Sequence, residues 1–129
     1  MHITIILIAI GMSVLIYCFP IVRVCGVSMY PTYKDGQIII CTRLFHEIKN
    51  GEVYLFEHPY RENRILIKRV VSQKGQQETL NSIRQYKYYF FLGDNLLNSS
   101  DSRDFGYVCE TNIKAKVLSK GDTNVEKGN

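Results

Sequence analysis

A serine in a tight turn is the first residue of this sequence whose type and setting could do covalent chemistry. Ser28 lies in the segment Gly26-Val27-Ser28-Met29-Tyr30-Pro31-Thr32, which Asp35-Gly36 soon follows. A turn presents a hydroxyl with little crowding, and glycine lets another backbone approach closely. Taken alone, however, a serine in a turn is more often only a turn residue.

A lysine inside an apolar, strand-like segment is the second candidate. Lys68 lies in Ile65-Leu66-Ile67-Lys68-Arg69-Val70-Val71, where the alternation of a strand puts Leu66, Lys68 and Val70 on one face and Arg69 on the other. Whichever face is buried takes a cation inward, which is costly unless the charge is paired or lost. Burial should lower the pKa of the ammonium and give a neutral amine that can act as a general base. The alternative is that Lys68 lies at an edge or extends its amine to solvent.

A polar loop bounded by glycines is the third candidate. It runs over positions 93–106 with the sequence Gly-Asp-Asn-Leu-Leu-Asn-Ser-Ser-Asp-Ser-Arg-Asp-Phe-Gly. Its short Asp, Asn and Ser side chains can bond to the backbone and hold an irregular turn. An exposed, flexible loop is the alternative.

Short strands must position these three candidates. The five predicted strands, all rich in β-branched and aromatic residues, are Gln37–Thr42, Glu52–Phe56, Arg64–Ser72, Lys87–Leu92 and Asn112–Leu118. Turn residues such as Lys34-Asp35-Gly36 separate them, and no long apolar stripe of helical period follows Arg23. The sequence therefore predicts a compact, mainly β domain over residues 23–119, a barrel or folded sheet, with a polar tail over 120–129.

The N-terminal stretch carries no charged side chain from His2 to Val22. As one helix it would be about 31 Å long, enough to cross a bilayer, which predicts a transmembrane anchor over residues 1–22. A cleaved secretory signal is one alternative, although it would need a basic start and a small-x-small cleavage site. A buried core helix is another, although a helix apolar on every face has no solvent side. Only Arg23 and the terminal amine flank the stretch, so charge determines its orientation weakly.

Composition narrows the classes of function. The chain has 129 residues, 46% of them hydrophobic and 22% charged, which is typical of one folded domain. The net charge of +4 is spread without a basic run, so no nucleic-acid partner is predicted, and it would suit an anionic membrane surface. The four cysteines and three histidines lack zinc-type spacing, so no metal or cofactor is predicted. Cys25 and Cys41 are interpreted as small buried apolar residues.

Together and in this order, behind an apolar segment, the three candidates resemble the conserved boxes of bacterial type I signal peptidases, also called leader peptidases. The resemblance covers most of residues 3–118 and implies a signal-peptidase-like β fold behind a transmembrane helix. Only positions 69–92 separate Lys68 from Gly93, which leaves no room for the inserted second domain of some family members. The chain would be a minimal catalytic core.

The resemblance implies a role for each matching residue. Ser28 matches the nucleophile and Lys68 the general base, a Ser/Lys dyad without histidine, and Ser99 matches the serine that orients the lysine. The Ser28 backbone N–H would donate to the oxyanion. Some members add a side-chain hydroxyl two residues earlier, where this chain has Gly26 in the substrate groove. The charged residues that match the scaffold of the site are Asp94, Asp101, Arg69 and Arg103.

The implied activity is that of a membrane-anchored serine endopeptidase that removes signal peptides from secretory preproteins. The substrate would add as an extended strand to a sheet edge beside Ser28, and shallow apolar pockets would select small-x-small sites, typically Ala-x-Ala. The same resemblance implies a single-pass protein of the bacterial cell membrane with its domain on the extracytoplasmic side, in contact with the lipid bilayer. Met29 and Tyr30 would then lie near lipid.

One departure and three other classes of protein complete the comparison. The usual Gly-Asp-Asn-Arg of the family is Gly-Asp-Asn-Leu here, with Leu96 replacing the arginine. A non-cleaving assembly or binding module at the membrane would be signalled by loss of Ser28 or Lys68, and both are present. A self-cleaving transcription regulator also uses a Ser/Lys dyad but needs a helix-turn-helix. Signal peptidases of the eukaryotic type have histidine at the base position.

Overall fold

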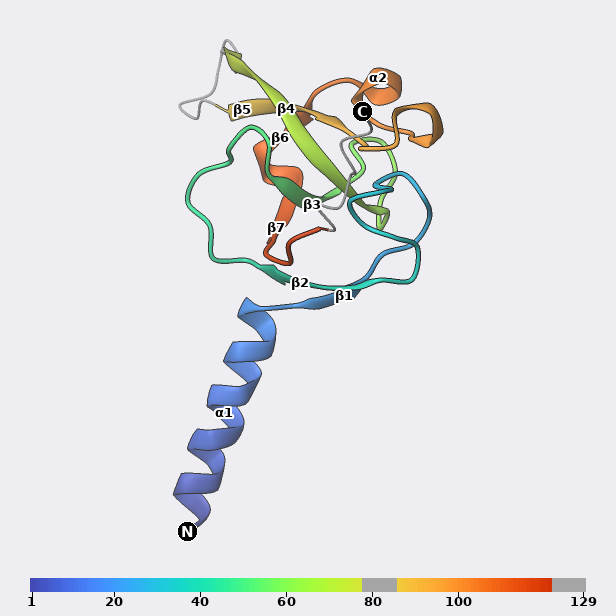
Figure 1. Ribbon diagram of the computed structural model, residues 1–129. Helices are drawn as coiled ribbons and strands as arrows, with labels where there is room; N and C mark the ends of the chain where they lie inside the picture. The colour runs from blue at the N-terminus through green and yellow to red at the C-terminus, as the bar shows by residue number, and fades with distance from the viewer. Residues whose placement is uncertain (78–85, 122–129) are drawn as a thin grey trace.

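The computed structural model of the chain describes residues 1–77 and 86–121, which form a mainly β body with one projecting helix (Figure 1). Within these residues, seven strands join in one sheet in the spatial order β1-β2-β7-β3-β4-β5-β6, and each neighbouring pair is antiparallel. The strands are β1 (Ile21–Arg23), β2 (Ile38–Thr42), β3 (Val53–Glu57), β4 (Ile65–Gln77), β5 (Tyr86–Leu92), β6 (Val108–Cys109) and β7 (Ile113–Val117). The helices are α1 (His2–Cys18), α2 (Ser102–Phe105) and the short 3-10 turns η1 (Leu96–Asn98) and η2 (Glu110–Asn112).

All five predicted strands are present, as β2, β3, β4, β5 and β7, and the mainly β prediction is confirmed. The β4–β5 pair fills the interval between Lys68 and Gly93 that was predicted to be too short for an inserted domain. Positions 78–85 of that interval, and 122–129 of the predicted tail, lie outside the described residues. The edge strands β1 and β6 were not predicted, because segments of two or three residues are too short to show an alternating pattern.

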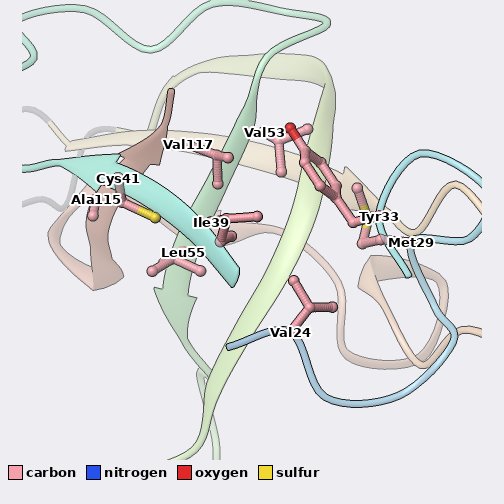
Figure 2. Close-up of a cluster of buried hydrophobic side chains, with 9 residues drawn as sticks. All are labelled: Val24, Met29, Tyr33, Ile39, Cys41, Val53, Leu55, Ala115 and Val117. Carbon is pink, nitrogen blue, oxygen red and sulfur yellow. The ribbon is translucent and has the colours of Figure 1, made fainter. Parts of the chain in front are cut away.

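The central strand β3 has a core on each of its faces. Val53 and Leu55 pack into one cluster and Tyr54 and Phe56 into the other, which explains why this strand is apolar without alternation. The first cluster consists of Val24, Met29, Tyr33, Ile39, Cys41, Val53, Leu55, Ala115 and Val117 (Figure 2). The second is largely aromatic, and its Phe56 and Phe91 rings stack with centroids 4.3 Å apart. Met29 and Tyr33 enter the first cluster from the turn that carries Ser28, so this core supports that turn.

The N-terminal helix is shorter than the predicted anchor. α1 has 17 residues and ends at Cys18, which at about 1.5 Å per residue makes it about 26 Å long. Pro20 lacks a backbone N–H and disfavours helical geometry at Phe19, so the helix cannot continue. The Pro20 carbonyl instead accepts from the Cys41 N–H (2.9 Å), which draws the chain onto β2. The prediction of one helix through residue 22 is therefore wrong, and in the described part of the chain no helix combines the length and apolar character needed to cross a membrane.

Candidate active site

The turn that carries Ser28 is held from both of its ends. The Tyr30 N–H donates to the Val27 carbonyl (3.1 Å), and the Tyr33 N–H donates to that of Met29 (3.0 Å). The Met29 side chain is fully buried in the first core cluster, whereas Tyr30 is about half exposed. The expectation that Met29 lies near lipid is therefore wrong, because its side chain points into the first core cluster.

The chain before Ser28 is fixed by a carboxylate. The Gly26 N–H donates to Asp35 Oδ1 (2.7 Å), and Val24 exchanges backbone hydrogen bonds of 2.8 Å with Gln37 and Gly36 across the base of the loop. Gly26 has a φ of 89°, a conformation in which a side chain would be strained. Gly26 therefore offers no side-chain donor to an oxyanion, and its backbone N–H already donates to Asp35.

Lys68 lies inward on β4 and contacts Ser28. Its side chain is only 3% exposed, and its Nζ lies 2.7 Å from Ser28 Oγ and 3.0 Å from the Ile67 carbonyl oxygen. Val70, two residues along the same face, is fully buried. The face of β4 that carries Lys68 is therefore the buried one, and the alternative that its amine extends to solvent is excluded.

Burial changes the protonation of this lysine. Desolvation lowers the pKa of Lys68 to about 8, the negative charge of Asp101 raises it, and the positive charge of Arg64 lowers it further. Desolvation disfavours an ammonium because its charge is no longer hydrated. A substantial fraction of Lys68 is therefore neutral in mildly alkaline solution, and a neutral amine within hydrogen-bond distance of a hydroxyl can take its proton.

The first residues of the polar loop join it to β4. Asp94 accepts two hydrogen bonds from Arg69, at 2.8 Å from Nε and 2.6 Å from Nη2, and Arg69 also donates to the Gly51 carbonyl (2.6 Å). Burial would raise the pKa of Asp94, but the hydrogen bonds from Arg69 and Thr32 hold it below its ordinary value. This bidentate pair fixes the loop beside the strand of Lys68.

The second part of the loop closes around a buried carboxylate. Asp101 is fully buried and pairs with Arg103 through Nε (2.8 Å) and Nη2 (2.9 Å). It also accepts from the Gly93 N–H (3.0 Å) and caps α2 in a capping box with Asp104. Burial opposes its ionisation, yet the bonds from Arg103 and Gly93 lower the pKa of Asp101 to about 2. The four charged residues predicted as scaffold thus form two ion pairs at the two ends of the loop.

Asn95 is a positioning residue that was not singled out from the sequence. Its side-chain amide donates to the Val27 carbonyl (3.0 Å), and its backbone N–H donates to the Ser28 carbonyl (2.9 Å). The loop therefore holds the serine turn on both sides of the Ser28 N–H. In the sequence, its place directly after Gly93 and Asp94 is the only signal of this role.

Ser99 is close to Ser28 but not bonded to Lys68. Its Oγ is buried and makes no hydrogen bond of good geometry within the described residues, but its hydroxyl lies near Asp101 and helps to lower the pKa of that carboxyl. A Cβ added to Gly93 would collide with Ser99 Oγ and with the Ser28 carbonyl oxygen. Gly93 is therefore what allows the loop to pack directly onto the Ser28 turn. The lysine-orienting role of Ser99 stays a prediction.

An open cleft of about 440 Å³ reaches Ser28 and Lys68. Two segments supply most of its lining, the chain from Val22 to Val27 and the chain from Arg64 to Ile67, which leads into β4. On the side away from β3 this part of β4 pairs with no strand of the described chain, because β5 pairs with β4 only from Arg69 onward. The cleft thus offers a free strand edge and mostly apolar side chains to an extended chain.

The cysteines form neither a disulfide nor part of a metal-binding group in the described part of the chain. Cys41 is buried, and burial raises the pKa of its thiol to about 11, but Cys25 is exposed in the wall of the cleft, so the prediction of burial fails for Cys25. All four cysteines are free. Among the described residues, no group of three or more His, Cys, Asp or Glu side chains could hold a metal ion.

Comparison with known proteins agrees with this geometry. Curated relatives include "Mitochondrial inner membrane protease subunit 1" of Xenopus tropicalis, 27% identical over 113 residues that cover 78% of this chain and 68% of the relative. "Mitochondrial ATP-independent inner membrane protease subunit 1a" of Arabidopsis thaliana is 32% identical over 117 residues, 79% of this chain and 70% of the relative. "Signal peptidase I V" of Bacillus subtilis is 26% identical over 134 residues, 70% of this chain and 79% of the relative.

These relatives carry mitochondrial as well as bacterial names, so a bacterial origin stays a prediction. The family described as "Signal peptidase, peptidase S26" matches residues 1–86 and 78–120, nearly the whole chain. With the order of the serine, lysine and loop segments and their convergence on one cleft, this match identifies the chain as a member of the signal peptidase family, peptidase S26.

Proposed function

We propose that this chain is a serine endopeptidase that removes signal peptides from preproteins, with Ser28 as the nucleophile and Lys68 as the general base. The observation that carries the proposal is the 2.7 Å separation of Ser28 Oγ and a Lys68 Nζ that is almost fully buried. A serine hydroxyl needs a neighbouring base to become nucleophilic, and Lys68 is a base whose lowered pKa, about 8, suits that task.

The proposed reaction has two halves. Neutral Lys68 takes the Ser28 proton as Oγ attacks the scissile carbonyl, and the ammonium then gives that proton to the leaving amine as the peptide bond breaks. Lys68, neutral again, deprotonates a water that attacks the resulting ester, and the proton returns to Oγ as the acyl group leaves. No metal or cofactor takes part in this scheme.

The oxyanion would be held by the backbone of Ser28. Its N–H donates to no other group within the described residues, so it is available for the negative charge that develops on the carbonyl oxygen. Asn95 flanks this N–H with two hydrogen bonds and keeps it in place. Gly26 would contribute only to the wall of the cleft, because its N–H is bonded to Asp35.

The proposed substrate is an extended peptide with a small-x-small site, typically Ala-x-Ala. It would pair with the free edge at the start of β4 and with the chain from Val22 to Val27, and place small side chains against the apolar lining of the cleft. Backbone pairing would supply affinity for many sequences, and the shallow lining would exclude large side chains beside the scissile bond.

We also propose that the peptidase works at the surface of a bilayer, with its β domain on the extracytoplasmic side. α1 buries none of its side chains and projects away from the β body (Figure 1), so its isoleucines and leucines are available for lipid. Two of the relatives are named as inner membrane proteases. Held by α1, the cleft would meet signal peptides where they leave the membrane.

The test is cleavage of a detergent-solubilised preprotein with an Ala-x-Ala site by the full chain. Ser28→Ala and Lys68→Ala should each lower kcat by about 10²–10⁴-fold or more, the range for a lost general base, while both variants stay folded by circular dichroism. The matched control is Ser72→Ala, a serine of β4 that pairs with Phe90 beyond the cleft, which should keep wild-type rates. A folded wild type that binds preproteins without cutting them would favour a non-cleaving assembly module, and substantial activity in Lys68→Ala would exclude the dyad.

A further inference from the structure

Two arginines line the cleft besides Lys68. Arg23 is the last residue of β1, Arg64 directly precedes β4, and both line the same cleft as Ser28 and Lys68. The described residues that line the cleft include no Asp or Glu. The mostly apolar cleft therefore carries two positive charges besides Lys68 and no negative one from these residues.

Neither arginine has a partner within the described residues. The guanidinium groups of Arg69 and Arg103 are each paired with an aspartate, whereas those of Arg23 and Arg64 make no hydrogen bond or ion pair in the same part of the chain. Arg64 also lies close enough to Lys68 to lower the pKa of its ammonium. The positive charge of Arg64 therefore acts on Lys68 inside the cleft, and no acidic side chain of the described residues pairs with it.

The positions of these arginines correspond to a definite place on an extended peptide. Arg64 precedes Lys68 by four residues along β4 and the residue before it, and a peptide paired with this edge advances by the same rise of about 3.3 Å per residue. Arg23, which precedes Ser28 by five residues, ends β1 and lines the same cleft. The small-x-small residues would occupy the apolar lining next to the dyad, on the amino-terminal side of the scissile bond. The arginines would then meet the residues four and five positions before that bond.

We propose that Arg23 and Arg64 form a specificity site that selects substrates with an acidic side chain four or five residues before the scissile bond. This inference rests on the proposed function, since it assumes an extended peptide in the cleft. A guanidinium presents two parallel N–H donors that match a carboxylate, which an amide or a small side chain does not. A lysine at the same substrate position would be repelled by both arginines.

An anionic lipid headgroup could also bind a guanidinium, but the position of the pair favours a peptide. Arg23 and Arg64 belong to the two chain segments that line the cleft of Ser28, so an extended peptide bound in the cleft would run beside both. The arginines therefore sit on the route of the substrate as well as at the surface.

The experiment compares peptides that differ only at the fourth and fifth positions before an Ala-x-Ala site, with Glu, Gln or Lys there. For the full chain in detergent, kcat/KM should follow the order Glu, Gln, Lys, with up to about fivefold between Glu and Gln for each arginine. The preference should fall in 0.5 M salt, because exposed charges are screened. In R23Q/R64Q the kcat/KM values of the Glu and Gln peptides should become nearly equal. In R64E the Lys peptide should be cut with a higher kcat/KM than the Glu peptide.

The control variant is R61Q, which removes an exposed arginine of the turn before β4 that does not line the cleft, and it should keep the wild-type preference. Binding of the same fluorescent peptides to Ser28→Ala separates this inference from the proposed function. If the wild type cuts nothing but Ser28→Ala still prefers Glu through the two arginines, the specificity site stands and the peptidase proposal fails. If cleavage depends on Ser28 but ignores the charge, or if R23Q/R64Q changes only binding to anionic vesicles, the specificity site is overturned.

Discussion

Burial of Lys68 has a cost in stability because the ammonium loses its hydration. Its pKa in the folded chain is about 8, below the ordinary 10.5, so between these pH values the unfolded chain binds more protons and stability rises with pH. Below about pH 8 Lys68 is charged in the folded chain and lowers the free energy of unfolding by its full amount. Each unit by which the pKa is lowered corresponds to about 1.4 kcal/mol.

Lys68→Met should therefore stabilise the fold at pH 7, because Met is of similar length and apolar. The expected gain in the free energy of unfolding is as much as about 3 kcal/mol, and it should shrink as the pH rises from 8 to 10.5. Urea unfolding at pH 7 and pH 10 measures both values. An equal difference at the two pH values would mean that Lys68 is not desolvated.

Ser99 offers a second prediction at this scale, since its buried hydroxyl lies near Asp101 but makes no hydrogen bond of good geometry within the described residues. A buried hydroxyl without a well-formed hydrogen bond costs about 1–3 kcal/mol, and the favourable effect of this hydroxyl on Asp101 opposes that cost, so Ser99→Ala should change the melting temperature little. If Ser99 orients Lys68 once substrate is bound, the same change should lower kcat and leave KM nearly unchanged. Thermal unfolding and steady-state kinetics separate the two effects. Wild-type kcat in this variant would contradict the orienting role.

The polar loop over residues 93–106 is the element that joins the two halves of the dyad. It bonds to β4 through Asp94 and Arg69, to the serine turn through Asn95, and to itself through Asp101. A buried carboxylate that accepts charged and backbone hydrogen bonds contributes more than a neutral pair would. Asp101 is thus the residue on which the shape of this loop depends most.

Asp101→Asn should cost about 2–3 kcal/mol, the scale of a lost hydrogen bond to a charged group, and should also lower kcat because the loop supports Ser28. The lowered pKa of Asp101, about 2 against an ordinary 3.8, means that its contribution is full above about pH 3.8 and is lost as the pH falls through 2. In acid unfolding experiments, the free energies of unfolding of the wild type and of Asp101→Asn should therefore converge near pH 2. Asp104→Asn, which removes a charge but keeps an oxygen that can accept from the Asp101 N–H, is the milder control. Equal effects of the two changes would contradict this account.

The same elements show what the sequence could predict and what it could not. Alternation and turn residues predicted β2, β3, β4, β5 and β7, because each strand is long enough to display its pattern. Alternation also put Lys68 and Arg69 on opposite faces, but it could not say which face was buried, since that depends on the distant strands and turns that cover β4. The contacts of Asn95 and the burial of the Ser99 hydroxyl escaped prediction for a similar reason, because they depend on how a long irregular loop folds back on the serine turn.

At the scale of the whole molecule, the helix and the β body are joined by a short junction. The Cys18 carbonyl accepts from the Arg43 N–H (2.9 Å), and the Arg43 guanidinium lies 4.4 Å from the centre of the Tyr17 ring. The earlier part of α1 makes no comparable contact in the described structure and buries no side chain. The sheet therefore gains little from the helix, whereas the junction helps to fix the start of β1.

Removal of residues 1–16 should accordingly leave the β body intact. We expect the free energy of unfolding to change by no more than about 0.5 kcal/mol, as for surface changes that remove no packing, and soluble peptides to be cut at nearly the wild-type rate. Association with lipid vesicles should be lost, because the exposed apolar residues of α1 are then gone, and cleavage of vesicle-bound preproteins should fall while cleavage of soluble peptides does not. Vesicle flotation and the two cleavage assays measure these outcomes. A truncated chain that still floats with vesicles would assign membrane binding to the β body, and one that loses activity on soluble peptides would show that α1 supports the cleft itself.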